Sequence, residues 1–292
     1  MAFVIKEQLA ASGNYGGSRT AAKIKYLVIH YTGNDGDKAA NNAAYYQSNV
    51  VEASAHYFVD DTTVFRSVPD LKVAWAVGGK KYASCDRTGG GTMHGIITNT
   101  NSISVELCDT VRDCTYRASE ATLANAVALC VELMAKYDIP LENVYRHFDV
   151  TGKLCPSYMV DAEKWAEFKE RLQKRAADNI PAAYAEDAVS WAVANGIMTG
   201  SADGDLMLTQ SLTRQQFVTM LWRWHGEPES DHSVDHHIDA HTISSYAEEA
   251  VAWALEHGIK GGYPDGTLRP HGTATRAHVA TFIQRFYENV LQ

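Results

Sequence analysis

The sequence predicts an α/β domain, a mixed sheet flanked by helices, followed by a small all-α domain of helix–loop–helix repeats. Two observations support this fold class. In the N-terminal part, β-branched apolar runs alternate with helical patterns, which is typical of a sheet covered by helices. In the C-terminal part, residues 183–224 and 245–286 align without a gap at an offset of 62, with 17 of 42 positions identical. Such similarity predicts equivalent stacked units.

Charge divides the chain in the same way. Residues 1–175 hold 20 basic and 20 acidic residues, so the whole net charge of −9 lies in residues 176–292. We therefore place the domains at 1–178 and 179–292. An acidic second domain argues against nucleic acid as a partner, because nucleic-acid affinity depends on basic contacts.

Targeting and redox features are sparse. No apolar run reaches the ~18 residues that a membrane span needs. Glu7 interrupts the only apolar stretch near the N-terminus, so we expect no secretory signal and synthesis in the cytoplasm. The odd count of five cysteines then favours reduced thiols. The sequence assigns no role to Cys85 or Cys114.

Secondary structure in the first domain follows from apolar periodicity. The predicted helices are 38–49, 119–137 with Ser119 as its cap, and 161–175. The predicted strands are 24–31, 55–60, 63–68, 102–108 and a short strand running into His147.

Two polar residues in these strands are candidates for chemistry. His30 ends a buried strand, where it is either a satisfied core histidine or part of a site. Glu106 interrupts an apolar strand, and a buried acid is costly unless it is paired or functional. The stretch 145–157 adds His147, Lys153 and Cys155; imidazole and thiolate are both zinc ligands.

A long Gly-rich segment separates these strands. Residues 70–101 lack clear periodicity, and loops of this length in a compact domain are often functional. Trp75 and His94 lie in this segment and could line a groove for an extended ligand. Plain packing is the equally weighted alternative for Trp75.

Four segments of the first domain resemble a known family. They are VIHYTGN (28–34), SAHYFVDD (54–61), NSISVELC (101–108) and RHFDVTGKLCPS (146–157). Their order and content resemble the zinc-dependent N-acetylmuramoyl-L-alanine amidases that share a fold with phage lysozyme-type amidases and peptidoglycan recognition proteins. The resemblance implies a hydrolase that cuts the amide between N-acetylmuramic acid and L-alanine of bacterial peptidoglycan.

The resemblance also implies roles for individual residues. One zinc ion would be held by His30, His147 and Cys155, with water in the fourth position. Lys153 would help to polarise the scissile carbonyl, and Glu106 would be the general base. A catalytic Tyr of a phage relative is Ala55 here, so the proton-transfer role falls to Glu106. His56 and Tyr57 then remain as candidates for substrate binding only.

The C-terminal repeats are predicted as pairs of helices. Tyr184, Ala188, Trp191 and Ala192 mark one face of the first helix, and the second helix of each unit should bury its aromatics. Thr213 and Gln216 form a capping box, which the second unit is expected to lack because His278 replaces the Gln. The core candidates, aromatic and aliphatic, are Phe217, Leu221, Trp224, Val279, Ile283 and Phe286.

The repeats resemble S-layer homology repeats in AVAWALEHGIKGGYPDGTLRP (250–270), LTRQQ (212–216) and ATRAH (274–278). The resemblance implies attachment to anionic secondary polymers of the cell wall, with Arg214 and Arg276 as polymer-binding candidates. An ordering role at each helix start is the alternative. The family usually stacks three repeats, so self-association is a way to complete the unit.

Several functional readings follow. We expect a phage or prophage endolysin that acts at the bacterial cell wall after release. A host autolysin and a non-catalytic peptidoglycan-recognition protein are the alternatives. The His-rich stretch 225–244 is interpreted as a solvated linker, with a metal site or pH sensor as the minor alternative. The host, the stem-peptide type, the polymer and the oligomeric state do not follow from the sequence.

Overall fold

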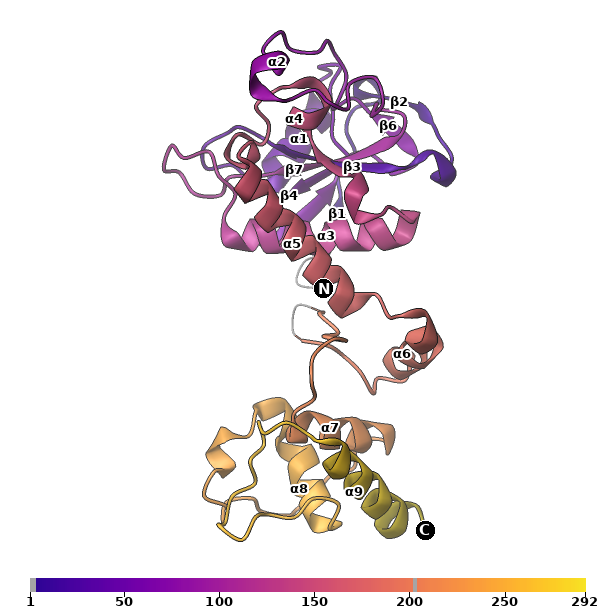
Figure 1. The fold of residues 1–292 in the computed structure, drawn as a ribbon, viewed down its shortest axis with the longest axis vertical. Helices are drawn as coiled ribbons and strands as arrows, with labels where there is room; N and C mark the ends of the chain where they lie inside the picture. Colours follow the sequence, from indigo (N-terminus) through magenta and orange to yellow (C-terminus); the bar gives the residue numbers. More distant parts are fainter. Residues whose placement is uncertain (1–3, 202–203) are drawn as a thin grey trace. The chain divides into compact units, whose positions relative to one another are not determined.

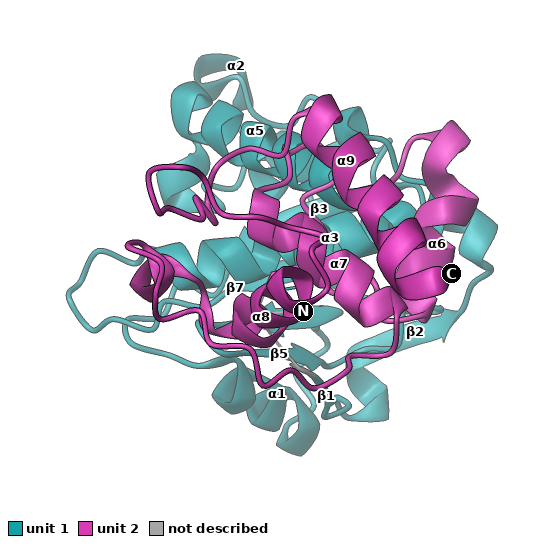
Figure 2. Cartoon of the chain, turned by 90° about the horizontal axis from the view of Figure 1, so that it is seen from below, with its two compact units in different colours: residues 1–180, 202–205 teal, residues 181–201, 206–292 magenta. Residues whose placement is uncertain are grey.

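The chain folds into two compact units, shown in Figure 2. The structure is a computed structural model that describes residues 4–201 and 204–292. Unit 1 comprises residues 1–180 and 202–205, and unit 2 comprises residues 181–201 and 206–292. Within the described part of the chain, every helix is too short or too polar to cross a membrane.

Unit 1 is built on a six-stranded sheet with the strand order β1-β5-β4-β7-β3-β8 (Figure 1). The pair of β4 and β5 is antiparallel and the other neighbouring pairs are parallel, so the sheet is mixed, as predicted. A separate antiparallel pair joins β2 to β6. The strands are β1 (Val4–Glu7), β2 (Tyr15–Ser18), β3 (Tyr26–Tyr31), β4 (Tyr57–Val59), β5 (Thr63–Arg66), β6 (Lys72–Ala74), β7 (Ser102–Leu107) and β8 (Val144–Arg146).

Helices cover this sheet in two groups. Helix α3 packs against β4 and β7, and α5 packs against α3, whereas α1 packs against β4 and β5. Ser119 caps α3 by accepting a hydrogen bond from the amide of Thr122, as predicted. Two short helices were not predicted, α2 and α4. The helices of unit 1 are α1 (Ala39–Ser48), α2 (Cys85–Thr88), α3 (Glu120–Tyr137), α4 (His147–Thr151) and α5 (Ala162–Asn179).

Strand alternation gives the two faces of the sheet different tasks. Ile29 of β3 and Val105 of β7 belong to the large core that α3 and α5 cover. Successive side chains of a strand point to opposite faces. His30 and Glu106 therefore project from the other face, as does Phe58, which packs with α1. This face carries the candidate site.

Unit 2 contains two helix–loop–helix repeats, as predicted. Its main core is formed by α7, α8 and α9 and includes Val218, Trp253 and Phe282. No residue of α6 belongs to that core among the described residues. The helices are α6 (Glu186–Ala194), α7 (Arg214–Trp224), α8 (Glu248–Glu256) and α9 (Arg276–Phe286).

The two repeats are therefore unequal in burial, which the sequence did not predict. Trp253 of α8 is 1% exposed, whereas its equivalent Trp191 of α6 is 53% exposed. Trp224 and Ile283, expected in the core, are also exposed. Similar repeat sequences do not give equal burial, because neighbouring elements determine which face of each helix is buried.

The second repeat also has the capping box that we expected it to lack. Thr275 accepts a hydrogen bond from the amide of His278, and Nδ1 of His278 accepts one from the amide of Thr275 at 3.2 Å. The imidazole nitrogen thus replaces the amide oxygen that Gln216 supplies in the first repeat. The prediction was wrong because His has an acceptor at a similar reach.

The unequal repeats give a stability prediction. Trp253→Ala should lower the free energy of unfolding of the chain by about 3–5 kcal/mol, because it empties a packed core position. The matched Trp191→Ala should cost less than about 1 kcal/mol. Urea denaturation of both variants, followed by circular dichroism, measures the difference. Equal losses would contradict the asymmetry of the two repeats.

Candidate functional site

The sheet register brings the first two site residues together. In the parallel pair of β3 and β7, His30 is the register partner of Glu106. His30 is 2% exposed, and its Nδ1 lies 3.8 Å from Oε1 of Glu106. The carboxyl ends of parallel strands meet at one edge, so both side chains stand where the loops of the sheet converge.

Helix α4 and the loop after it supply the next two residues. His147 is the first residue of α4, which follows β8 directly. The amide of Phe148 donates to the carbonyl of Cys155 at 2.9 Å, so the loop folds back onto the helix start. Asp149 fixes that start by accepting from the backbone and side chain of Arg146.

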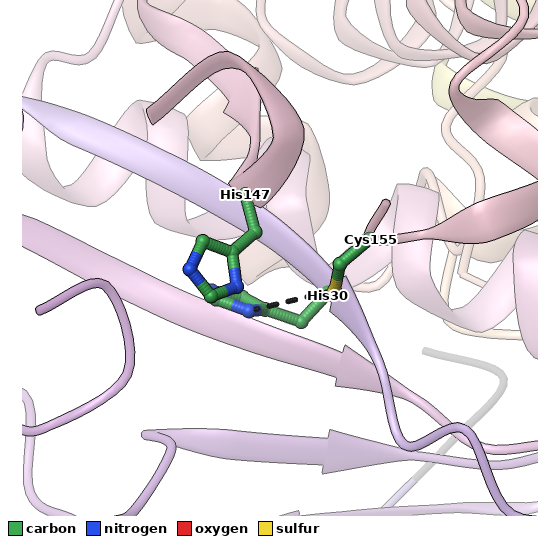
Figure 3. A group of neighbouring side chains, drawn as sticks. All are labelled: His30, His147 and Cys155. Carbon is green, nitrogen blue, oxygen red and sulfur yellow. Dashed lines mark hydrogen bonds between the residues drawn. The ribbon is translucent and has the colours of Figure 1, made fainter. Parts of the chain in front are cut away.

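These elements bring three metal-ligating side chains together. His30, His147 and Cys155 are all buried, and each offers a donor atom within 4.8 Å of the other two. Figure 3 shows the three side chains gathered at one point, with Nδ1 of His30 3.9 Å from Sγ of Cys155. Nε2 of His30 and Nδ1 of His147 are buried with no hydrogen-bond partner among the described residues.

Burial sets the protonation of these groups. Burial and the nearby His147 and Lys153 hold the pKa of His30 well below its usual range. Burial, with Lys153, lowers the pKa of His147 to about 4, so both imidazoles are neutral at neutral pH. Burial raises the pKa of the Cys155 thiol to about 12, assisted by Glu106. Two neutral imidazoles and a thiol that only a cation would ionise form a donor set suited to a metal ion.

Glu106 and Lys153 stand beside this group. Burial raises the pKa of Glu106 to about 8, with Lys153 opposing the shift and Asp37 adding to it. Oε2 of Glu106 is buried and has no hydrogen-bond partner in the described structure. Lys153 is exposed and lines two hollows of ≈510 and ≈500 Å³.

The two hollows have different walls. The first also contacts Glu106, and the second also contacts His147. Lys153 lines both. The first is lined by Tyr31, Thr32, Asn34, Asp37, Asn41, Asn42, Tyr45, Tyr46, Phe58, Glu106 and Lys153. The second is lined by Gly78, Gly79, Lys80, Lys81, Tyr82, His147, Thr151 and Lys153.

Two predicted substrate residues are placed elsewhere. His56 is fully buried and bonded to Arg19, to the carbonyl of Lys72 and to the amide of Ser104. Tyr57 is 2% exposed and donates its hydroxyl to Asp70 at 2.5 Å. Both predictions were wrong, because these side chains are fully used inside the unit.

The other two substrate candidates lie at the Gly-rich segment. His94 is exposed, and its Nε2 lies 3.3 Å from the carbonyl of Gly79, which lines the second hollow. Trp75 is partly buried and lines neither hollow. Asn34, Asn41 and Asn42 were not singled out from the sequence, although they line the first hollow. The motif VIHYTGN, which contains Asn34, was the available signal.

In unit 2 the two arginine candidates differ. Arg214 is 5% exposed, stacks on the rings of Tyr263 and Phe282, and donates to the Tyr263 hydroxyl at 2.9 Å. Its Nε has no hydrogen-bond partner among the described residues. Arg276 is exposed at the start of α9.

Sequence reasoning missed a third cation, Lys260. It is 1% exposed, and its Nζ has no hydrogen-bond partner in the described part of the chain. Burial, with the charge of Arg214, lowers its pKa to about 8. The repeat alignment held the signal, because Lys260 occupies the position of Met198 in the first repeat.

Comparisons with known proteins agree with both resemblances. Residues 20–158 match the family model described as N-acetylmuramoyl-L-alanine amidase, and residues 177–206 and 239–280 match the S-layer homology domain. The N-acetylmuramoyl-L-alanine amidase CwlL of Bacillus licheniformis is 31% identical over 159 residues, which are 52% of this chain and 41% of CwlL. CwlA of Bacillus subtilis (strain 168) is 29% identical over 178 residues, covering 59% of this chain and 58% of CwlA.

The matched region is thus about half the length of these relatives. Among solved structures, PlyL is 31% identical, with 58% of this chain and 97% of the PlyL chain covered and a TM-score of 0.46. The catalytic domain of XlyA is 29% identical, with 58% and 99% covered and a TM-score of 0.45.

The buried Lys260 gives a prediction for the pH dependence of stability. A lysine whose folded pKa of about 8 is below its unfolded value of 10.5 opposes folding below pH 8, and that penalty disappears as the pH rises toward 10.5. Lys260→Met should therefore raise the free energy of unfolding at pH 7 by about 3 kcal/mol. The gain should shrink between pH 8 and 10.

Urea denaturation of the wild type and Lys260→Met at pH 7 and at pH 10 measures the difference in the free energy of unfolding. A gain that is independent of pH would show that Lys260 is not charged and buried at neutral pH.

Proposed function

We propose that this chain, which carries an amidase-family domain followed by S-layer homology repeats, hydrolyses the amide bond between N-acetylmuramic acid and L-alanine in peptidoglycan. One observation carries the proposal. Three buried metal-ligating side chains converge beside Glu106, a partly buried acid, and Lys153, which lines both hollows. This is the arrangement that amide hydrolysis needs.

We propose zinc as the metal. Two imidazoles and one thiolate leave a fourth position open, which is the pattern of catalytic zinc sites. Donors bonded to one zinc ion at about 2.1 and 2.3 Å lie no more than about 4.4 Å apart, and the His30 Nδ1 to Cys155 Sγ distance of 3.9 Å meets that limit. When bound, zinc supplies a Lewis acid that polarises a carbonyl and makes water more acidic.

Glu106 acts as the general base and acid. A pKa near the working pH is best for moving protons in both directions, and burial raises the pKa of Glu106 to about 8. Its unpartnered Oε2 is free to accept the proton of the attacking water. The protonated carboxyl can then pass that proton to the departing amine of L-alanine.

Lys153 stabilises charge on the substrate. It has no ion-pair partner among the described residues, so its ammonium is available to a developing oxyanion. One such donor is worth ~3–4 kcal/mol of barrier. Because Lys153 borders both hollows, we assign one hollow to each side of the scissile amide.

Product analysis tests the reaction and the base together. Mass analysis of digested peptidoglycan should show new free amino groups on L-alanine and no new reducing ends. Glu106→Gln should lower the rate ~10²–10⁴-fold, because Gln cannot take a proton, while the zinc content stays unchanged. New reducing ends would exclude the amidase assignment, and a wild-type rate in Glu106→Gln would exclude the base.

We further propose that unit 2 binds an anionic polymer of the cell wall. The support is a pair of buried cations, Arg214 and Lys260, for which the described residues offer no ion-pair partner. Arg269, which is paired with Asp265, stacks on Tyr263 at 4.0 Å, as Arg214 does on the same ring. Buried charges are costly without a counter-charge. A carboxylate or pyruvyl group of a glycan would supply it, and the planar guanidinium of Arg214 suits bidentate contact.

Self-association through the repeats is a further proposal. Tyr184, in the 3₁₀ turn before α6, is 95% exposed, and Trp191 of α6 is 53% exposed, so this part of the first repeat has an exposed aromatic surface. A third repeat, or the same helix of a second copy, would bury such a surface. Sedimentation of the full chain tests for a second copy.

Wall binding should depend on the buried cations and not on the exposed one. Lys260→Met and Arg214→Gln should each weaken sedimentation of the chain with purified cell walls by about tenfold or more, since each removes a desolvated charge. Arg276→Gln is the matched control and should bind as the wild type does. Lys260→Met is the stricter variant because it should raise stability, so weaker binding cannot come from unfolding. Undiminished binding in both buried-site variants would refute this polymer site.

A further inference from the structure

Two loops at the edge of the sheet hold a group of carboxylates apart from the proposed zinc ligands. One loop follows β3 and contains Asp35, and the other follows β7 and contains Asp109 and Asp113. Each of the three offers a carboxylate oxygen, and these oxygens all lie within 4.8 Å of one another. Like charges this close repel. Backbone amides compensate Asp35, and Thr115 compensates Asp113, but Oδ2 of Asp109 has no such partner among the described residues.

Asp109 has one carboxylate oxygen for which the described residues supply no partner. It is 3% exposed, and its Oδ1 accepts from the amide of Val111 at 3.1 Å. Its Oδ2 is buried and has no hydrogen-bond partner among the described residues. Burial and the charges of Asp113 and Asp35 raise the pKa of this carboxyl. A buried, unpartnered oxygen within a carboxylate group is a position for a ligand.

Hydrogen bonds from Thr115, with the charge of Arg117, lower the pKa of Asp113, but no ion pair forms with the group in the described structure. None of Asp35, Asp109 and Asp113 forms an ion pair with a lysine or arginine within the described residues. The Cys114 thiol contacts Oδ2 of Asp35 at 3.8 Å but is not one of the converging donors. The converging donors are therefore all oxygen atoms. Hard cations prefer oxygen ligands more strongly than zinc does.

We propose that Asp35, Asp109 and Asp113 bind a calcium ion that joins the two loops. Calcium bonds oxygen at 2.3–2.6 Å, so oxygens around one ion lie within roughly 5 Å of one another, as these do. Its irregular coordination tolerates loop ligands and completes itself with backbone oxygens or water. Magnesium demands near-ideal octahedral geometry, so it should bind less well. The proposal does not depend on the amidase activity.

A calcium ion at this position would affect the first hollow, because one of the two loops that it joins forms part of that hollow's wall. The loops already meet at Asp37, whose amide donates to the carbonyl of Asp109 at 2.6 Å and whose Oδ1 accepts from the Asp109 amide at 2.9 Å. Asp37 and Asn34 line the hollow that also contains Glu106. Calcium would hold this wall in place by joining the same two loops, although it touches no reacting group.

The test uses the zinc-loaded full chain in buffer freed of calcium. Calorimetric titration with calcium chloride should show one site in the wild type. Asp113→Asn should raise the dissociation constant for calcium at least tenfold, because it removes one charged ligand. Asn can still accept the hydrogen bonds that Asp113 accepts from Thr115, so the loop should keep its fold. Asp86→Asn, at an exposed aspartate of α2, is the control and should bind as the wild type does.

Thermal denaturation gives a second readout. The difference in melting temperature between Asp113→Asn and the wild type should change sign when calcium is added. Without calcium, Asp113→Asn should melt above the wild type, because it relieves repulsion among carboxylates. With millimolar calcium, the order should reverse. Magnesium at the same concentration should shift the wild type less than calcium does. Absence of calcium binding, or equal shifts in wild type and Asp113→Asn, would overturn the proposal and leave a protonated Asp109 as the explanation. Amide cleavage is measured separately, so failure of one proposal does not affect the other.

Discussion

The parallel register between β3 and β7 is the constraint on which the site in unit 1 depends. It sets His30 opposite Glu106 on one face, while Ile29 and Val105 fill the core on the other. Because the side-chain period of a strand is two, a slip of one residue would turn the histidine and the acid into that core. The apolar contacts of α3 with the sheet therefore hold the register that aligns the site. The packing of the apolar face of the sheet therefore determines which polar side chains stand together on the opposite face.

Burial then determines what the aligned groups can do. Desolvation keeps His30 and His147 neutral, raises the pKa of Cys155 to about 12 and raises that of Glu106 to about 8. Without a cation the centre holds neutral groups, and Nε2 of His30, Nδ1 of His147 and Oε2 of Glu106 have no hydrogen-bond partner within the described residues. A dication reverses the preference of the thiol, since a coordinated thiol is deprotonated.

The sequence predicted the elements whose signals are local. Periodicity located β3, β7 and α3, and the strand-end histidine and the interrupted apolar run identified His30 and Glu106. The prediction failed where the deciding partner is distant in the sequence. His56 looked available, but Arg19, 37 residues away, bonds its ring. Trp191 and Trp253 are equivalent by alignment, yet only neighbouring helices decide which one is covered. The short strands β2 and β6 likewise depend on each other and lack a periodic pattern of their own.

Unit 2 raises a question about charge that its fold answers. Unit 2 carries 12 acidic residues against 6 basic ones, which would repel an anionic polymer at long range. Screening confines that repulsion to about 8 Å at physiological salt, so binding is decided by close contact. Arg214 and Lys260 are buried and have no ion-pair partner among the described residues, so each would attract an anion at contact more strongly than the exposed Arg276. Net charge describes the approach of a partner, whereas buried unpaired charge determines whether it stays. For this reason an acidic unit can still present a site for an anion.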